Sequence, residues 1–352
     1  MLDINEMLKT VMFKGASDLH ITVGLRPMIR VNGELLETEF PLLEPEDTKE
    51  LVYQILKERH KNTLEEKGEV DLSYTYPGLS RFRVNAYRQR GSYAMALRAI
   101  PMEIPDIEDL YLPEVLRTLA NKRRGIILVT GPTGSGKSTT LAAMINHINK
   151  TRKEHIVTLE DPIEYLHRHN RSIINQREIG GDTENFANSL RASLRQDPDV
   201  ILVGEMRDLE TIATALTAAE TGHLVLATLH TIGAAKTIDR VIDVFPPHQQ
   251  QQVRVQLSGV IEGIISQQLL QTADGQARRA ALEIMVATPA IRNLIREGKS
   301  HQIQTSIQTG AKLGMETMDK SLINLYNRGL ISKENLYKYC VDPDTIKRYV
   351  PV

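Results

Sequence analysis

The chain has 352 residues, enough for two domains of ~150 residues that each bury a core. Its 41% hydrophobic and 25% charged residues indicate a folded protein, and 43 basic against 44 acidic residues leave no excess charge for binding nucleic acid. The single cysteine, Cys340, excludes an internal disulfide and a cysteine-based zinc site. The apolar runs are too short to span a bilayer, and the first ten residues contain acids where a signal peptide needs bases, so we expect a cytoplasmic location.

Residues 1–100 are predicted to form a small α+β domain. The expected elements are a helix over 3–14, extended segments at 19–23 and 28–31, a charged helical segment over 45–67, and strands near 70–76, 81–88 and 92–99. Asn32-Gly33 stands between apolar stretches and predicts a hairpin turn. Prolines at 101, 105 and 113 then interrupt the pattern, so we expect a linker over 101–112.

Residues 113–352 are predicted to form a second domain of the α/β class. The expected strands are 126–130, 156–159, 200–203 and 224–228, and the expected helices are 114–121, 137–150, 183–195, 208–221 and 234–243. Continuous apolar strands that alternate with helices predict a parallel sheet covered by helices on both faces. The segments 247–268 and 289–350 are predicted to be mostly helical.

The segment 131–138 matches the complete phosphate-binding loop pattern G-x-x-x-x-G-K-[ST], and it lies between a predicted strand and a predicted helix. Its glycines allow backbone N–H groups to turn toward phosphate oxygens. We expect Lys137 to reach the β- and γ-phosphates and the Ser138 hydroxyl to bind Mg²⁺. The predicted nucleotide-binding residues are Gly131, Pro132, Thr133, Gly134, Ser135, Gly136, Lys137, Ser138 and Thr139. The sequence therefore predicts a site for ATP and Mg²⁺.

Three side chains that follow other predicted strands should lie at the same edge of the sheet. Glu205 is the candidate for orienting the attacking water, although an acid at a helix N-terminus would also be favourable there. Gly204 occupies the position where an aspartate is usual, so metal coordination should come from another strand or through water. Glu160 is the candidate for that metal and water side, and His230 for sensing phosphate, whereas His223 should lie at the opposite end of its strand.

The predicted strand near 81–88 and the residues after it carry Arg81, Arg83, Arg88 and Arg90 without an acid among them. Strand alternation places the first two on one face and the last two on the other, unless a bulge intervenes. They form either a solvated face or a source of arginine donated in trans to the γ-phosphate of a neighbouring subunit. An aromatic content of only 5% argues against nucleic-acid binding.

Taken together, the motifs resemble those of the type IV pilus retraction ATPases, which belong to the secretion ATPase superfamily, over essentially the whole chain. The corresponding segments are the phosphate-binding loop at 131–138, the acidic Asp box at 158–164, the atypical Walker B motif at 200–205 and the His box from Thr221 to His230. In addition, residues 290–299 resemble the AIRxxIREGK signature of retraction ATPases. Periodicity alone predicts only an amphipathic helix there, so the link to retraction comes from the resemblance.

The resemblance implies a PAS-like N-terminal domain followed by a RecA-like ATPase domain with a helical C-terminal part. It also implies a cytoplasmic homohexamer, peripherally associated with the inner membrane at the pilus base, that hydrolyses ATP with Mg²⁺. Such a ring would act on an inner-membrane platform protein and, through it, on pilin. Neither nucleic acid nor structural zinc is expected, and the arginines at 81–90 would reach the nucleotide of a neighbouring subunit.

Four alternatives stay open at this point. An accessory retraction paralogue would share these motifs, whereas a pilus-extension or type II secretion ATPase is usually longer and often carries a four-cysteine zinc module. A single cysteine therefore favours retraction over extension. A RecA-like nucleic-acid motor would share the loop and the ring, but the balanced charge argues against it. A nucleotide-binding scaffold without turnover is disfavoured by the pair Glu160 and Glu205.

Overall fold

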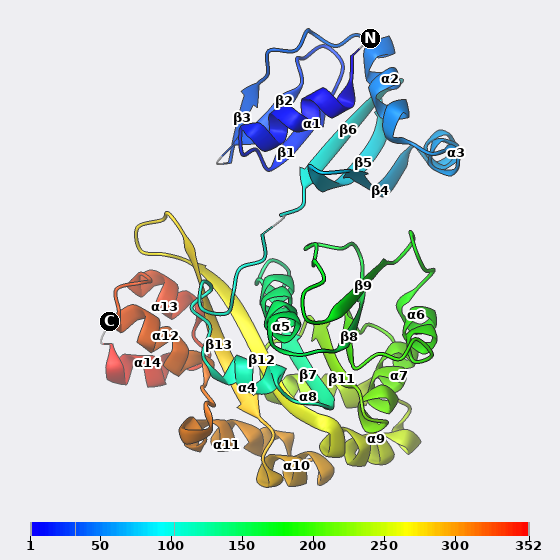
Figure 1. Cartoon of the computed structure of the whole chain (residues 1–352). Coiled ribbons are helices and arrows are strands. Elements are labelled where there is room, and N and C mark those ends of the chain that lie inside the picture. The colour runs from blue at the N-terminus through cyan, green and yellow to red at the C-terminus, as the bar shows by residue number, and fades with distance from the viewer. Residues whose placement is uncertain (1, 32, 102, 351–352) are drawn as a thin grey trace. The chain divides into compact units, whose positions relative to one another are not determined.

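A computed structural model describes residues 2–31, 33–101 and 103–350 (Figure 1). The chain divides into two compact units: the first comprises the residues up to Glu103 together with Glu164–Leu166, and the second comprises Ile104–Ile163 and the residues from His167 onward. Each unit has its own sheet and its own hydrophobic core.

The first unit is an antiparallel sheet with the strand order β3-β2-β1-β6-β5-β4. Its elements are α1 (Ile4–Phe13), β1 (Asp18–Ile21), β2 (Met28–Val31), β3 (Glu34–Glu37), α2 (Pro45–Ile55), α3 (Glu58–Lys67), β4 (Glu69–Tyr76), β5 (Ser80–Gln89) and β6 (Ser92–Ala99). Alternation along β5 places Phe82, Val84 and Ala86 in the core that the sheet shares with α1, α2 and α3. The intervening arginines Arg81 and Arg83 therefore lie on the opposite face.

Most elements predicted for this unit are confirmed, with one difference. The segment 45–67 forms two helices rather than one, because Leu56 adopts an extended backbone at the end of α2. The predicted hairpin is present in that β2 and β3 pair antiparallel, with Val31 opposite Glu34, and Gly33 has a φ of +90°. Asn32 lies outside the described residues.

The second unit contains a sheet with the order β13-β12-β7-β11-β10-β8-β9, in which every neighbouring pair is parallel except β12 and β13. Its strands are β7 (Gly125–Thr130), β8 (His155–Glu160), β9 (Ile173–Glu178), β10 (Val200–Val203), β11 (Leu224–Leu229), β12 (Ile261–Gln271) and β13 (Arg278–Val286). The residues of β7, β10 and β11 are all buried, as expected for central strands covered on both faces.

Helices cover both faces of this sheet, as predicted. Along β7, Ile126 and Leu128 face one hydrophobic core, and Ile127 and Val129 face the other. The second of these cores includes α4 (Val115–Ala120) and α5 (Lys137–Thr151). The first includes α6 (Phe186–Ser193), α7 (Leu209–Glu220), α8 (Ala234–Asp243), α9 (Pro247–Val260), α10 (Pro289–Arg296) and α11 (Ile303–Thr309). A separate cluster joins the ends of β12 and β13 to α12 (Met318–Asn327), α13 (Lys333–Tyr339) and α14 (Pro343–Tyr349).

The prediction for 247–268 is wrong in its second half, because α9 ends at Val260 and β12 begins at the next residue. Strands β9 and β13 were also not predicted. Residues 261–268 form a strand rather than a helix because of their tertiary contacts. Ile264 and Ile265 are fully buried on the two faces of the sheet, and β12 is paired on both sides, with β7 and with β13.

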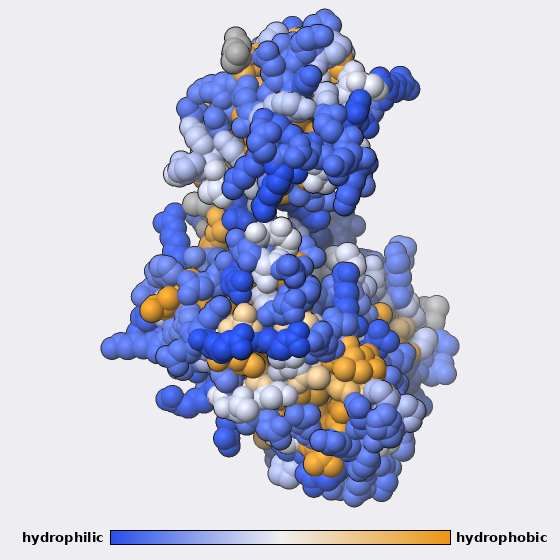
Figure 2. Space-filling model, turned by 90° about the vertical axis from the view of Figure 1, so that its right-hand side faces the viewer, coloured by the Kyte–Doolittle hydropathy of each residue, from blue (hydrophilic) through white to orange (hydrophobic). Residues whose placement is uncertain are grey.

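Figure 2 shows one face of the molecule, on which most residues are hydrophilic and hydrophobic residues gather mainly over part of the second unit. Among the hydrophobic side chains exposed on that unit are Ile173, Leu209 and Val255. None of the helices formed by the described residues has the length and apolar character needed to cross a membrane.

The core of the first unit should depend on Phe82, one of its largest fully buried side chains. Phe82→Ala should lower the free energy of unfolding of this unit by about 3–5 kcal/mol, because it removes apolar contacts and leaves a cavity. The matched control is Phe13→Ala, since Phe13 is 91% exposed in the same unit. Hydrogen exchange should accelerate across β5 and β6 in the first variant alone, and equal exchange in both variants would contradict the prediction.

Candidate functional site

The carboxyl ends of β7, β11, β10 and β8 lie at one edge of the sheet because these neighbouring strands are parallel. The strand order therefore fixes the order of the segments that follow them: the phosphate-binding loop, His230, Glu205 and then Glu160. Four candidates far apart in sequence are thus arranged along one edge.

The phosphate-binding loop connects β7 directly to α5, as predicted. Gly131, Gly134 and Gly136 have φ values of +142°, +78° and +87°, a region that other residues rarely adopt. Gly136 is the N-cap of α5, and no side chain in the described part of the chain caps this helix. The N–H groups of its first turn are therefore left for an anion, which the helix dipole also favours.

Lys137 lies buried across the loop. Its ammonium donates hydrogen bonds to the carbonyl oxygens of Gly131, at 2.9 Å, and Pro132, at 3.0 Å. Ser135 is also buried, and its Oγ finds no hydrogen-bond partner among the described residues. Ser138 is half-buried at the second position of α5. A buried ammonium beside an unpaired buried hydroxyl suits a ligand rich in acceptor oxygens, such as phosphate.

Gln267 of β12 also contacts this loop, and sequence reasoning missed it because its segment was predicted to be helical. Its Nε2 donates to the carbonyl oxygen of Ser135 at 2.6 Å, and its Oε1 accepts from the hydroxyl of Thr140 at 2.8 Å. One signal could have identified the strand: Asp274-Gly275, a typical hairpin turn, lies between β12 and β13.

Glu205 follows β10, and its carboxyl contacts the side chains of Arg207 and His230. The His230 Nε2 lies 3.1 Å and the Arg207 Nε 2.5 Å from its Oε1, and the Glu205 side chain is only 17% exposed. Burial alone would raise the pKa of this carboxyl, but the hydrogen bond from Arg207 and the neighbouring imidazole outweigh burial and lower the pKa below its usual value. Glu205 is therefore a carboxylate at neutral pH. Arg207 was not among the predicted site residues.

Gly204 has a packing reason to replace the usual aspartate. Its N–H donates to the carbonyl oxygen of Leu159 at 2.7 Å, and a Cβ at this position would lie 3.0 Å from that oxygen. The carbonyl of Gly204 accepts from the Thr228 hydroxyl at 2.5 Å, so this position is tied to both neighbouring strands. The alternative role of Glu205 as a helix-capping acid is filled by Asp208, which accepts from the N–H of Thr211.

Glu160 ends β8, and its Oε1 accepts from the Thr158 hydroxyl at 2.5 Å and from the Gln176 amide at 3.1 Å. Strands β10 and β11 separate β8 from β7. With strands ~4.8 Å apart, β8 is roughly 14 Å from β7. His223 lies at the opposite end of β11, as predicted, and its Nδ1 lies 2.9 Å from the carbonyl oxygen of Ala218.

The four candidate arginines of the first unit have different surroundings. Arg81 is half-buried and Arg83 is exposed. Arg88 lies with its Nη1 3.4 Å from Glu65 and its guanidinium over the ring of Tyr93. Arg90 lies beyond the end of β5, in the turn before β6, and has a φ of +49°. The alternation predicted for the last two therefore does not extend to Arg90.

The segment 290–299 forms α10 and the turn after it. Ile291 and Ile295 are buried, as the periodicity predicts. Arg292 donates to the carbonyl oxygens of Ser258 and Gly259, each at 2.9 Å, and to Glu262 at 2.7 Å. In this chain Arg292 therefore fixes α10 to the junction of α9 and β12.

The chain is similar to known proteins over nearly its whole length. The family model described as "Type II/IV secretion system protein" matches residues 1–338. The type IV pilus retraction ATPase PilT of Pseudomonas aeruginosa is 52% identical over 334 residues, which cover 95% of this chain and 97% of that protein. The type IV pilus ATPase PilU of the same organism is 42% identical, over 95% of this chain and 87% of its own length.

Among solved structures, the pilus retraction motor PilT with bound ADP has a TM-score of 0.92 and 51% sequence identity to this chain. The match covers 99% of this chain and 100% of that structure, including both units described above. With a family model that spans nearly the whole sequence, and relatives that match in both sequence and fold, this chain belongs to the type II/IV secretion system protein family.

Proposed function

We propose that this protein is an ATP-hydrolysing motor that powers the retraction of type IV pili. The observation that carries the proposal is the phosphate-binding loop, whose helix α5 has no side-chain cap, at the same edge of the sheet as the ionised carboxylate of Glu205. The extensive similarity to PilT, whose solved structure holds ADP, supports the nucleotide and the biological role together. The higher identity to PilT than to PilU supports the role of main motor over that of accessory motor.

The proposed chemistry uses residues from three strand ends. The loop N–H groups and Lys137 hold the phosphates, and Thr139 continues that cradle along α5. Glu205, ionised and facing the same edge, accepts a hydrogen bond from the attacking water and orients it. His230 contacts Glu205 at 3.1 Å, so a change at the phosphate would be transmitted to the carboxylate through this imidazole.

Magnesium is the expected partner of the nucleotide, and the donor set is compatible with it. Within the described ranges 2–31, 33–101 and 103–350, no group of three or more His, Cys, Asp or Glu residues could hold a metal alone. Mg²⁺ takes few protein ligands and keeps phosphate oxygens and waters, so we assign the Ser138 hydroxyl as one of its protein ligands. When bound, the ion neutralises charge on the phosphates. Two strands separate β8 from β7, so we propose that Glu160 contacts the ion through water rather than directly.

The proposed assembly is a cytoplasmic homohexamer, peripherally bound to the inner membrane, where it acts on a platform protein and thereby on pilin. An arginine from the first unit of a neighbouring subunit would complete each nucleotide site. The candidates are Arg81, Arg83, Arg88 and Arg90, of which Arg88 already pairs with Glu65.

Glu205→Gln should lower ATP turnover by at least about 100-fold while leaving ADP affinity unchanged, because it removes the base but keeps the side-chain shape. The matched control is Glu210→Gln, which alters an exposed carboxylate that pairs with Arg191 on the surface. Steady-state turnover and calorimetric ADP binding measure the two quantities. Full turnover in Glu205→Gln would remove Glu205 from the mechanism.

Arg207→Gln should move the acidic limb of the pH–rate profile to higher pH. Arg207 lowers the pKa of Glu205, so its removal lets this carboxyl gain a proton, and lose its function as a base, at higher pH. Arg207→Gln should shift the acidic limb by the same amount when the wild type and this variant both also carry His230→Gln. The reason is that the limb reports the protonation of the Glu205 carboxyl, not that of His230. Arg240→Gln, on the exposed surface of α8, serves as the control, and an unmoved limb in Arg207→Gln would contradict the assignment.

Deletion of the gene in its native host should leave cells with abundant pili and no surface motility, because pilus assembly continues while retraction stops. Electron microscopy and a motility assay measure the two properties. Complementation with the wild-type gene should restore motility, and complementation with the Glu205→Gln gene should not. Cells without pili would instead assign the protein to pilus extension.

A further inference from the structure

We propose that Gln267 is a positioning residue that holds the phosphate-binding loop in its binding conformation. The inference rests on the proposed nucleotide function and assigns a new role in it to a strand outside the recognised motifs. Gln267 is 2% exposed, although glutamine usually lies at the surface, and both ends of its amide are used within the loop region.

The position of Gln267 follows from the strand register. Thr130, the last residue of β7, is paired with Ser266 of β12. At the next residue the chain leaves the sheet as the phosphate-binding loop, while β12 continues, paired with β13, to Gln271. Gln267 is thus the first residue of β12 beyond β7, directly beside the start of the loop. A Cβ on Gly131 would lie only 2.2 Å from the carbonyl oxygen of Gln267, so the loop can pass here only with glycine.

The amide of Gln267 joins the loop to the helix that follows it. Its Nε2 donates to the carbonyl oxygen of Ser135, within the loop, at 2.6 Å. Its Oε1 accepts from the hydroxyl of Thr140, in the first turn of α5, at 2.8 Å. Thr140 is 1% exposed, so water cannot replace either bond. One buried side chain therefore fixes the loop and the start of α5 relative to each other.

This contact also sets the direction of a loop N–H group. In a planar trans peptide, the carbonyl and the following N–H point in opposite directions. Because the Ser135 carbonyl points to Gln267, the N–H of Gly136 points away from β12. A Cβ on Gly136 would lie 2.8 Å from the Gln267 Nε2, so the absence of a side chain at Gly136 lets this amide approach the loop. Gln267 thereby prepares the loop to bind phosphate before the nucleotide arrives.

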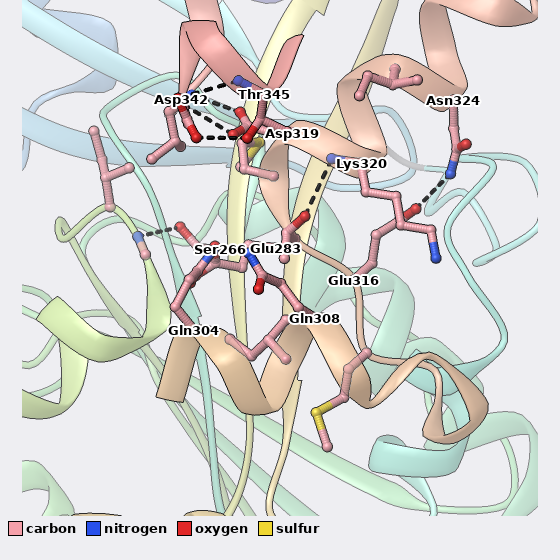
Figure 3. Close-up of a pocket in the computed structure, with 18 of the residues that line it drawn as sticks. Ser266, Glu283, Gln304, Gln308, Glu316, Asp319, Lys320, Asn324, Asp342 and Thr345 are labelled. Carbon is pink, nitrogen blue, oxygen red and sulfur yellow. Dashed lines mark hydrogen bonds between the residues drawn. The ribbon is translucent and has the colours of Figure 1, made fainter. Parts of the chain in front are cut away.

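Strand β12 is itself held from its other face. Ser266 accepts from the N–H of Gly233 at 2.8 Å, and Glu283 of β13 accepts from the N–H of Ala234 at 2.8 Å. Both side chains line a cavity of about 890 Å³ and lie close to Gln304 (Figure 3). Consecutive residues of β12 thus contact the phosphate-binding loop on one face and the segment after His230 on the other.

The test compares Gln267→Met with Gln268→Met in the full-length protein. Methionine keeps the volume of glutamine and removes both hydrogen bonds of Gln267. Gln268 is the next residue of β12, so its side chain points to the opposite face of the sheet from that of Gln267. It is half-buried, and its amide lies 3.5 Å from the carbonyl oxygen of Tyr339. We expect Gln267→Met to weaken ADP binding and to raise the KM for ATP by about tenfold, the size typical of a lost buried partner. Gln268→Met should bind ADP like the wild type.

A specific role in positioning predicts a change in the ratio of ADP to AMP affinity, because AMP lacks the β-phosphate that the loop holds. Gln267→Met should therefore lose ADP affinity while AMP affinity changes less than about threefold. Equal weakening of both nucleotides, or unchanged ADP affinity, would overturn the inference. Thr140→Val removes one of the two bonds without a change of shape and should move the ratio in the same direction. Its effect should not add to that of Gln267→Met.

The two levels of the hypothesis can fail separately. If the wild type binds ADP and turns over ATP, and both Gln267→Met and Thr140→Val match it, only the role of Gln267 is refuted. If the wild type binds ADP no more tightly than AMP, the proposed nucleotide function is refuted together with it. Thermal unfolding without nucleotide checks that each variant is folded. If Gln267→Met does not fold, Thr140→Val provides the decisive measurement.

Discussion

The site depends on one constraint, the parallel pairing of β7, β11, β10 and β8. Parallel strands place their carboxyl ends at one edge, so segments separated by up to about a hundred residues meet there. Parallel pairing is maintained only when both faces are covered, which explains why β7, β10 and β11 are buried throughout. The buried apolar strands therefore build the core and also bring the polar residues that follow them to one edge of the sheet.

Electrostatics at this edge resolve a conflict between burial and function. The carboxylate proposed to orient water must stay ionised, but burial favours its protonated form. Glu205 is mostly buried and still has a lowered pKa, because Arg207 and His230 lie on the same oxygen. The Arg207 side chain is 74% exposed, so its guanidinium remains hydrated. It nevertheless stabilises the ionised form of Glu205, whose side chain is mostly buried.

Local sequence signals were sufficient where function is carried by consecutive residues. The phosphate-binding loop and the short apolar strands before Glu160, Glu205 and His230 could be read directly, because each strand and its following side chain are adjacent in sequence. Contacts made across the fold could not be read in this way. Strand β12 contains Ser266 and Gln267 among its isoleucines, a mixture that resembles a helix until the pairing with β7 and β13 is known. Likewise, only the contact with Leu159 explains why Gly204 replaces the expected aspartate.

The contacts of β12 also connect the nucleotide site to the C-terminal helices. Gln267 is 132 residues from Ser135 in sequence and is bonded to it in the fold. Three residues further along the same strand, Leu270 is fully buried in the cluster formed with α12, α13 and α14. A motor must convert a small change at the phosphates into movement of larger elements, and packed strands transmit displacement because they deform little. The β12–β13 hairpin therefore links the phosphate-binding loop, through Gln267, to those helices, through Leu270.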